Sequence, residues 1–466
     1  MRKTSSVCPV CLRQIPAVRV KEDGAYYLRK TCPEHGDFST ILWRGSEDPA
    51  LWAGTMPESG AQPGLTCPED CGLCSNHLRG TCCTLLEITD RCNLNCTFCF
   101  ADPHAKADPS LDEVKGWIDE ILRQTGGTLL QFSGGEPTVR DDLPEIVAYA
   151  KEAGCTYIQL NTNGLRLAED PDYVKALAQA GLSFAFLQFD GVDDDVYRSL
   201  RGRPMLEIKK QAIEACSQNR IGVTLVPTLV PGVNTHQVGD IIRFGMDHSP
   251  AVRGIHFQPV SYFGRMPYLP RDDQRYTMGE LLDNIVEQTG GLVERESLIP
   301  SSCDHPLCGL HGDYIVMPHG RLANLSRRGM RSACSSSEVD PAVQNREYIG
   351  RRWSRLDEPE PQMADQPSPA SSGPSAPVSM DGASCCCCDV GGYCAQPEEP
   401  AVEEADVFSL DGFLRRKRTH GFTLTSMAFQ DAGNLDIERL RQCSLHVFRD
   451  GKRIPFCAAY LSRFEL

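Results

Sequence analysis

The residues best suited to chemistry are three cysteines, Cys92, Cys96 and Cys99, in the segment TLLEITDRCNLNCTFCFADP. They follow the apolar run TLLEIT, which predicts a β-strand. Three thiolates at this spacing can hold three irons of a cubane iron–sulfur cluster and leave the fourth iron open to a ligand. An open corner suggests a cluster that takes part in a reaction, because a fourth cysteine closes an ordinary ferredoxin-type cluster. A structural zinc loop, or a closed cluster with a distant fourth ligand, is the alternative.

A glycine-rich motif, Ser133-Gly134-Gly135-Glu136-Pro137, ends the second predicted strand. Glycines let a backbone approach a ligand closely, and a carboxylate can accept hydrogen bonds from an ammonium group. A tight turn is the alternative. With Phe98 and the three cysteines, this motif resembles the radical S-adenosylmethionine (SAM) superfamily. The resemblance implies a [4Fe-4S] cluster on Cys92, Cys96 and Cys99, an adenine near Phe98, and a SAM amino group received by Gly134, Gly135, Glu136 and Pro137.

Short β-rich runs alternate with amphipathic stretches over the middle of the chain, which predicts repeated βα units around a parallel sheet. The six predicted strands are 84–89, 128–134, 157–164, 184–191, 222–230 and 254–260. Six units are too few for a closed eight-stranded barrel. We therefore expect an α/β fold, a partial (β/α)6 TIM-like barrel of the radical SAM type, with small Cys-rich metal-binding modules at both ends.

Polar residues end the later strands, where the active site of a parallel βα barrel lies. Asn163 ends the third strand, and Gln188 and Asp190 end the fourth; these suit the ribose hydroxyls and carboxylate of SAM, although Asn-Gly and Asp-Gly are also turn dipeptides. Arg201 is a candidate partner for the SAM carboxylate through its forked donors, or a surface arginine. His256 reads as a core histidine, and Cys155 and Cys216 read as small apolar core residues.

The N-terminus carries two ligand pairs separated by a strand-rich segment, Cys8, Cys11, Cys32 and His35. This is the spacing of a zinc ribbon or a rubredoxin-like knuckle. Four filled positions predict a structural site, with zinc favoured over iron because one ligand is histidine. A redox iron is the alternative.

A second triad, Cys67, Cys71 and Cys74, has the same spacing as the SAM triad and is followed by Cys82 and Cys83. No predicted strand precedes it, so we assign SAM to Cys92, Cys96 and Cys99. The second triad then predicts an auxiliary cluster with Cys82 or Cys83 as its fourth ligand; zinc is the alternative.

Further candidate ligands lie after the barrel. They are Cys303 and Cys308, with His305, His311 and Cys334 near them in sequence, and Cys443, His446 and Cys457 in the tail, where a hairpin turns at Asp450-Gly451. The tail set is short of a full site, so we expect Cys303 or Cys308 to complete it and the tail to fold back on the barrel. The adjacent thiols Cys385–Cys388 and Cys394 could bind metal, form a redox pair or scavenge oxidants.

Composition divides the chain into six segments. They are a zinc-ribbon or rubredoxin-like knuckle (1–58), a Cys-rich auxiliary-cluster segment (59–83), the radical SAM core (84–300), a Cys-containing segment (301–356), a Pro/Ser-rich linker with the cysteine run (357–400) and a C-terminal auxiliary metal or cluster segment (401–466).

The chain of 466 residues has a formal net charge of -15, which argues against a nucleic-acid partner. No apolar stretch approaches the roughly 18 residues that a membrane span needs, and no signal peptide is evident, so we expect a cytoplasmic protein. Its 23 cysteines suggest metals rather than disulfides, in an anaerobic or well-reduced setting.

The run Arg415-Arg416-Lys417-Arg418 is a solvated face, or meets phosphate head groups of the inner membrane surface or an acidic electron donor.

The motifs CPVC…CPEHG, CPEDCGLCSNH, CNLNCTFCFADP, GGEP, CDHPLC and LRQC…HVF…IPFCAAY resemble the radical SAM subgroup that includes tetraether lipid synthase and the radical SAM (seleno)protein TrsS. The resemblance implies an oxidoreductase that takes an electron from ferredoxin or flavodoxin, cleaves SAM to a 5′-deoxyadenosyl radical and removes hydrogen from an unactivated carbon. A lipid or hydrocarbon chain is the first substrate to consider. A maturase of a peptide or small protein is the second hypothesis, and a non-catalytic Fe–S electron-transfer protein is the third. The cysteine run with GGYC departs from the lipid enzymes.

Overall fold

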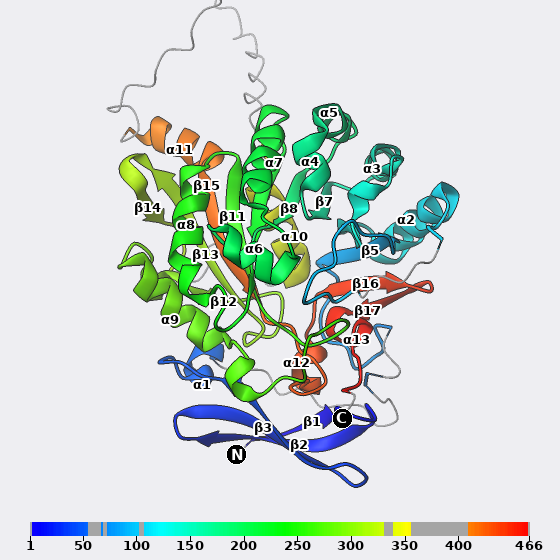
Figure 1. Ribbon diagram of the computed structural model, residues 1–466, viewed down its shortest axis with the longest axis vertical. Coiled ribbons are helices and arrows are strands. Elements are labelled where there is room, and N and C mark those ends of the chain that lie inside the picture. Colours follow the sequence, from blue (N-terminus) through cyan, green and yellow to red (C-terminus); the bar gives the residue numbers. More distant parts are fainter. Residues whose placement is uncertain are drawn as a thin grey trace, which may run out of the picture.

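The computed structural model describes residues 2–54, 67–68, 72–101, 107–329, 339–355 and 409–464. At the N-terminus, four strands form an antiparallel sheet in the order β1-β2-β3-β4, at the base of the molecule in Figure 1. They are β1 (Arg2–Val7), β2 (Gln14–Glu22), β3 (Ala25–Cys32) and β4 (Gly36–Trp43), and the short helix α1 (Pro49–Ala53) follows. The strand-rich segment between the two N-terminal ligand pairs is thus the β2–β3 hairpin.

The six predicted strands are present within a few residues of their predicted bounds. They are β5 (Cys83–Thr89), β6 (Leu129–Gly134), β7 (Tyr157–Thr162), β8 (Phe184–Gln188), β9 (Gly222–Val226) and β11 (Val252–Pro259), each parallel to its neighbour. The short strand β10 (Thr228–Leu229) also pairs with β11. Their carboxyl ends therefore meet at one edge, where the predicted site residues stand.

Amphipathic helices follow the strands and cover the outer face of the sheet (Figure 1). They are α2 (Leu111–Thr125), α3 (Leu143–Glu152), α5 (Pro171–Gln179), α7 (Leu206–Gln218), α8 (Val238–Asp247) and α9 (Met278–Thr289). Helix α2 shows why the sequence starts and stops a helix here: Ser110 and Glu113 form a capping box, and Gly126 ends the helix in the left-handed region. No helix in the described ranges is long and apolar enough to cross a bilayer.

Between the six predicted strands, two helices were not predicted, α4 (Leu165–Glu169) and α6 (Asp194–Arg201). Each begins shortly after a dipeptide that the sequence analysis weighed as a turn or a ligand, Asn163-Gly164 and Asp190-Gly191. In α6, the Asp193 side chain accepts hydrogen bonds from the first turn, so an aspartate-rich segment caps a helix.

The tail folds back on the barrel, as the sequence predicts, and extends the sheet at both edges. Strand β15 (Gly421–Met427) pairs in parallel with β11, and β16 (Leu445–Arg449) pairs in parallel with β5. Beyond β15 lie the antiparallel strands β13 (Gly309–Met317), β12 (Ile299–Pro300) and β14 (Arg321–Asn324), and β17 (Lys452–Pro455) forms the predicted hairpin with β16. Eight parallel strands thus line the barrel, which stays open.

A loop crosses the open side of the barrel. The Asp304 carboxylate, in the loop between β12 and β13, accepts hydrogen bonds from the Ser444 N–H (2.7 Å) and hydroxyl (2.9 Å) just before β16. The two edges of the sheet are therefore joined by side-chain contacts instead of a strand ladder. We call this region, Ser301–Cys308 with Cys443–Leu445, the seam.

Two helices close the amino-terminal end of the barrel, α10 (Pro341–Trp353) and α11 (Leu410–Thr419). The Trp353 ring packs on Phe184 and Phe186 at 5.5 and 5.3 Å between centroids. The buried Arg253 guanidinium donates to the carbonyls of Arg352, Arg418 and Thr419, at the carboxyl ends of both helices. The tail also contains the short helices α12 (Ile437–Leu440) and α13 (Phe456–Ala459).

Replacing Arg253 by methionine should loosen α10 and α11 together, because it leaves buried carbonyls at both helix ends without their donor. We expect unfolding free energy to fall by about 2 to 4 kcal/mol. Faster amide exchange confined to both helices, measured by mass spectrometry, would support this role. The exposed Arg243→Met variant on α8 is the control, and equal exchange in the two variants would contradict it.

Candidate functional site

The loop that carries Cys92, Cys96 and Cys99 begins at the carboxyl end of β5 and is held on several sides. The Leu94 N–H approaches the Cys92 Sγ at 3.4 Å. The backbones of Cys99 and Arg265 exchange two hydrogen bonds of 3.0 and 2.8 Å. These contacts place the three thiols at the strand ends, where the sequence predicts them.

The thiols of this loop lie close to one another and to charged side chains. Burial raises the pKa of Cys92 to about 11, and Glu136, Cys96 and Cys99 repel its thiolate. Arg201 contacts Cys96. Among the described residues, only the N-terminal group has ligand atoms within 4.8 Å of one another, as one ion requires. The three loop thiols do not all lie this close together.

The two glycines of the GGEP motif are required by the cluster loop itself. A Cβ on Gly134, whose φ is +124°, would lie 2.1 Å from the Thr89 carbonyl oxygen, and one on Gly135 would lie 2.1 Å from that of Arg91. The N–H groups of Gly135 and Glu136 donate to the same two carbonyls, each at 2.8 Å. The motif therefore seats the start of the cluster loop; its contact with SAM stays a prediction.

Glu136 has only 2% of its surface exposed, and its carboxylate is occupied by protein donors. One oxygen accepts hydrogen bonds from the Thr138 N–H (3.1 Å), the Thr138 hydroxyl (2.6 Å) and the Thr162 hydroxyl (2.7 Å), and the other accepts from the Asn163 N–H (2.7 Å). Burial still raises its pKa. Asn163 in turn donates to the Asn93 side chain at 2.7 Å, inside the cluster loop. Glu136 thus joins β6, β7 and the loop.

Asp190 and Arg201 form a buried ion pair beside the cluster loop. The guanidinium donates to both carboxylate oxygens at 2.7 Å, and the Asp190 side chain is fully buried. Gln188 also donates to Asp190. The structure therefore brings the predicted residues of the fourth strand together. Two of the Arg201 donors are bonded to Asp190 and are not available to a ligand.

Lys209, on α7, is a site residue that the sequence analysis missed. Its side chain is fully buried, and its ammonium donates to the Asn163 carbonyl (2.5 Å) and the Gln188 side chain (3.0 Å). Burial lowers its pKa to about 7, despite the attraction of Asp190. The sequence did contain a sign of this role: Lys209 lies on the same helix face as Ala212, Ile213 and Cys216, where an apolar residue is expected.

A cavity of about 1710 Å³ runs from the cluster loop through the barrel. Near the loop it is lined by Phe98, Cys99 and Phe100, and Phe98 packs edge-on against Tyr262 and Tyr268 at 5.8 and 6.0 Å. Polar side chains line its middle: Gln131, Asn161, His256, Gln258 and Thr425. The sequence analysis predicted a core histidine at His256, but this side chain faces the cavity. Its Nδ1 lies 2.9 Å from the Thr425 hydroxyl.

The N-terminal ligand set converges as predicted. The ligand atoms of Cys8, Cys11, Cys32 and His35 lie within 4.8 Å of one another, and His35 Nδ1 is 3.6 Å from Cys8 Sγ and 3.4 Å from Cys32 Sγ. Burial raises the pKa of the Cys32 thiol, but hydrogen bonds from Glu34 and His35 outweigh it and lower the pKa to about 6. This donor set fits one tetrahedral metal ion.

Many of the other predicted ligands gather at the seam. Cys82 Sγ lies 3.5 Å from Cys83 Sγ and contacts Cys303 across the open side. Cys308, Cys443 and Cys457 form a second buried group close by, in which Arg439 donates twice to Cys308 Sγ at 3.3 Å. The predicted approach of Cys308 to the tail cysteines is therefore observed, whereas Cys303 faces Cys82 instead.

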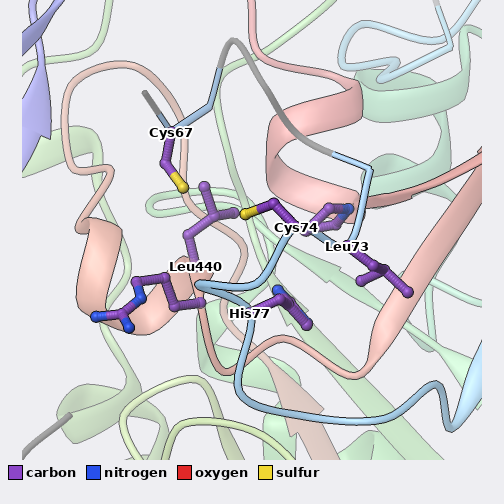
Figure 2. Close-up of a pocket in the computed structure, with 7 residues that line it drawn as sticks. Cys67, Leu73, Cys74, His77 and Leu440 are labelled. Atoms are coloured by element: carbon purple, nitrogen blue, oxygen red, sulfur yellow. The ribbon is translucent and has the colours of Figure 1, made fainter. Parts of the chain in front are cut away.

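Cys67 and Cys74 point into one small hollow, together with His77, beside Leu440 and Arg441 (Figure 2). His446 also lies here, because its Nε2 is 3.2 Å from His77 Nε2, and His77 Nε2 is in turn 2.7 Å from the Cys443 carbonyl oxygen. His446 is fully buried, and its Nδ1 has no hydrogen-bond partner among the residues that the structure describes. Cys457 lies in α13, just after the hairpin in which it was predicted.

The remaining cysteines divide simply. Cys155 and Cys216 are buried in the main hydrophobic core, as predicted. Cys71, Cys334, Cys385–Cys388 and Cys394 lie outside the described residues.

Comparison with known families fits this geometry. Residues 86–245 match the model of the Radical SAM superfamily, and residues 1–44 match the HMPTM N-terminal zinc ribbon domain. Residues 86–245 are therefore a radical SAM segment with an open α/β barrel, and they follow an N-terminal stretch that matches a zinc ribbon.

Two individual proteins are similar to this chain in sequence. The 7,8-dihydro-6-hydroxymethylpterin dimethyltransferase of Methanocaldococcus jannaschii is 41% identical over 311 residues, which cover 64% of this chain and 61% of that protein. The Fe-coproporphyrin III synthase of Methanosarcina barkeri is 32% identical over 232 residues, covering 47% of this chain and 56% of that protein. The chain thus spans less than two thirds of either relative.

Among solved structures, methylornithine synthase matches 58% of this chain and 82% of its own, with 16% identity and a TM-score of 0.37. Streptococcus suis SuiB bound to its precursor peptide SuiA matches 46% of each chain, with 15% identity and a TM-score of 0.37.

Removing two N-terminal ligands should remove one metal ion. We expect Cys8→Ser/Cys32→Ser to lose about one zinc per chain, since a tetrahedral ion is not held by two ligands. Elemental mass spectrometry of the purified protein measures this, with iron content as the internal reference. Cys216→Ala is the control, because its thiol lies in the core. Unchanged zinc in the double variant, or zinc lost equally from the control, would refute the assignment.

Lys209 predicts a pH dependence of stability. An unfolded lysine titrates near 10.5, whereas Lys209 in the folded chain titrates at about 7. Between these values the unfolded chain holds a proton that the folded chain has released, so raising the pH stabilises the fold. Between pH 7 and pH 9, the free energy of unfolding of the wild type should rise by up to about 2.7 kcal/mol more than that of Lys209→Met. Urea unfolding at both pH values measures the gain. Lys175→Met is the exposed control, and parallel pH profiles for wild type and Lys209→Met would contradict the prediction.

Proposed function

We propose that this protein is an iron–sulfur enzyme that reductively cleaves SAM and abstracts hydrogen from an unactivated carbon of a substrate held in the barrel. The observation that carries the proposal is the three-thiol loop at the head of a cavity of about 1710 Å³. A [4Fe-4S] cluster with SAM on its open iron supplies, after one-electron reduction, methionine and a 5′-deoxyadenosyl radical.

The protein's own residues hold and orient the reactants. Cys92, Cys96 and Cys99 bind the cluster, and Phe98 offers an aromatic edge to the adenine beside Tyr262. For the SAM amino group, the proposed acceptors are at Gly134–Pro137. Because the Glu136 carboxylate already accepts four hydrogen bonds, its role is to hold the strand ends in place, and carbonyl groups of the motif are the better acceptors.

Asn163, Gln188, Asp190 and Arg201 complete the proposed SAM site. The Asp190–Arg201 pair sets the guanidinium beside Cys96, from which its remaining donors can reach a carboxylate bound at the cluster. Lys209 holds Asn163 and Gln188 in place by donating hydrogen bonds to the Asn163 carbonyl and the Gln188 side chain. Aromatic rings at Phe98, Phe100 and Phe263 shield this end of the cavity from water, which protects a carbon radical from side reactions.

The lining of the barrel bears on the substrate. A hydrocarbon chain, suggested by the likeness to tetraether lipid synthase, suits the phenylalanines near the loop. It would also have to pass Gln131, Asn161 and His256 in the middle of the cavity, which favour a substrate with hydrogen-bonding atoms. A peptide or small protein, as in the maturase hypothesis, offers such atoms along its backbone.

A second candidate function is methyl transfer to a heterocycle. It is favoured by the 41% identity to the pterin dimethyltransferase and by amide side chains beside Phe186, a ring on which a heterocycle can stack. The substrate-radical step and the methyl-transfer step differ in their products, so 5′-deoxyadenosine and S-adenosylhomocysteine distinguish them.

We also propose auxiliary clusters on the remaining cysteines: the two groups at the seam, one of which contains Cys82 and Cys83, and the Cys67–Cys71–Cys74 triad. They would relay electrons from ferredoxin or flavodoxin in the cytoplasm. The support is the convergence of Cys82, Cys83 and Cys303, and of Cys308, Cys443 and Cys457. A non-catalytic electron carrier remains the outcome if SAM is never cleaved.

Anaerobic reconstitution followed by reduction in the presence of SAM tests the proposal. We expect 5′-deoxyadenosine from wild type and at least ~100-fold less from Cys92→Ala/Cys96→Ala/Cys99→Ala, because the open iron is lost. The control is Cys67→Ala/Cys74→Ala, which should lower iron content while cleavage persists. Wild-type protein that binds iron yet never cleaves SAM would overturn the enzyme proposal.

A further inference from the structure

The end of the cavity farthest from the cluster loop is positively charged, in a protein whose net charge is -15. Basic side chains of α10, α11 and the loop after β14 line it: Arg327, Arg351, Arg352, Lys417 and Arg418. Arg327, Arg351 and Lys417 are exposed there, and no carboxylate among the described residues forms an ion pair with them.

The carboxylates that line this end are already engaged. Asp313 pairs with Arg352, and Glu347 lies 3.6 Å from Arg346. Neither carboxylate forms an ion pair with Arg327, Arg351 or Lys417, so an anion entering this end would meet cations that no carboxylate in the described part of the chain pairs with.

The simpler explanation is that basic residues in the last turn of a helix stabilise its carboxyl end. Arg351 is in the last turn of α10 and Lys417 in that of α11. However, the Arg253 guanidinium already donates to the terminal carbonyls of both helices. Arg327 lies in a loop, so the stabilisation of a helix end does not explain its position. Three separate segments thus bring basic side chains to the lining of one cavity.

We propose that this end of the cavity binds an oxyanion, a phosphate group carried by the substrate, while the carbon that reacts lies at the cluster loop. The inference rests on the proposed function and deepens it. Two arginines and a lysine suit phosphate, since arginine offers paired donors and lysine a compact charge.

The distance between the two ends sets the size of the substrate. From Arg253, at the closed end, to Ser261, near the cluster loop, eight residue steps of β11 and its extension span roughly 26 Å. A molecule anchored at both ends is therefore elongated. A phospholipid has this form, and so does a phosphate ester with a long side chain.

Binding of inorganic pyrophosphate to the full chain, measured by isothermal titration calorimetry, tests the site. We expect Arg351→Gln/Lys417→Gln to weaken binding by about tenfold or more, since two charge-assisted contacts are lost. Lys175→Gln/Arg220→Gln removes the same charges from exposed positions outside the cavity and should change affinity by less than about twofold. Absent binding to wild type, or equal weakening in both double variants, would overturn the proposal.

Vesicles identify the source of the phosphate. Phosphatidylglycerol vesicles that bind wild type and compete with pyrophosphate, where phosphatidylcholine vesicles do not, would assign the site to a lipid head group. Pyrophosphate binding without vesicle competition would assign it to a soluble phosphate ester. SAM cleavage is assayed on the same preparations: anion binding without cleavage counts against the proposed function alone, and cleavage without anion binding counts against this inference alone.

Discussion

The architecture of the site depends on one buried carboxylate. Glu136 accepts four hydrogen bonds from the ends of β6 and β7, and the amide next to it is bonded to the start of the cluster loop. Burying a carboxylate is costly unless donors surround it, so the strand ends must stay where these donors are. Through Asn163 the same network reaches Asn93 and the buried ammonium of Lys209. The cluster loop is thereby placed by the fold before any ligand binds.

The open barrel explains where the other cysteines lie. A parallel sheet of eight strands that does not close leaves two unpaired edges, which a protein must cover. Here the antiparallel strands beyond β15, the β16–β17 hairpin and the Asp304–Ser444 contact perform that task. The seam brings residues from distant parts of the chain into contact, and Cys82 meets Cys303 there.

The cavity combines three environments along one axis. Aromatic rings surround the cluster loop, amides and an imidazole line the middle, and cations line the end closed by α10 and α11. Such a gradient orients an elongated molecule, because each of its parts has only one favourable position. The same helices that close the barrel through Arg253 thus provide the charges of the proposed anion site.

The sequence by itself determined the local features: six strands and their helices, the three-thiol loop, GGEP at a strand end and the N-terminal ligand set. These depend on periodicity, capping and short spacings, which neighbouring residues decide. Tertiary structure alone decided which edges β15 and β16 join, that Cys303 faces Cys82, that His446 meets His77, and that Glu136 and Arg201 are already occupied by protein partners. These contacts join residues far apart in the chain. Lys209 stands between the two cases: its place on an apolar helix face was visible in the sequence, but only the packed fold supplies the two acceptors that hold its ammonium.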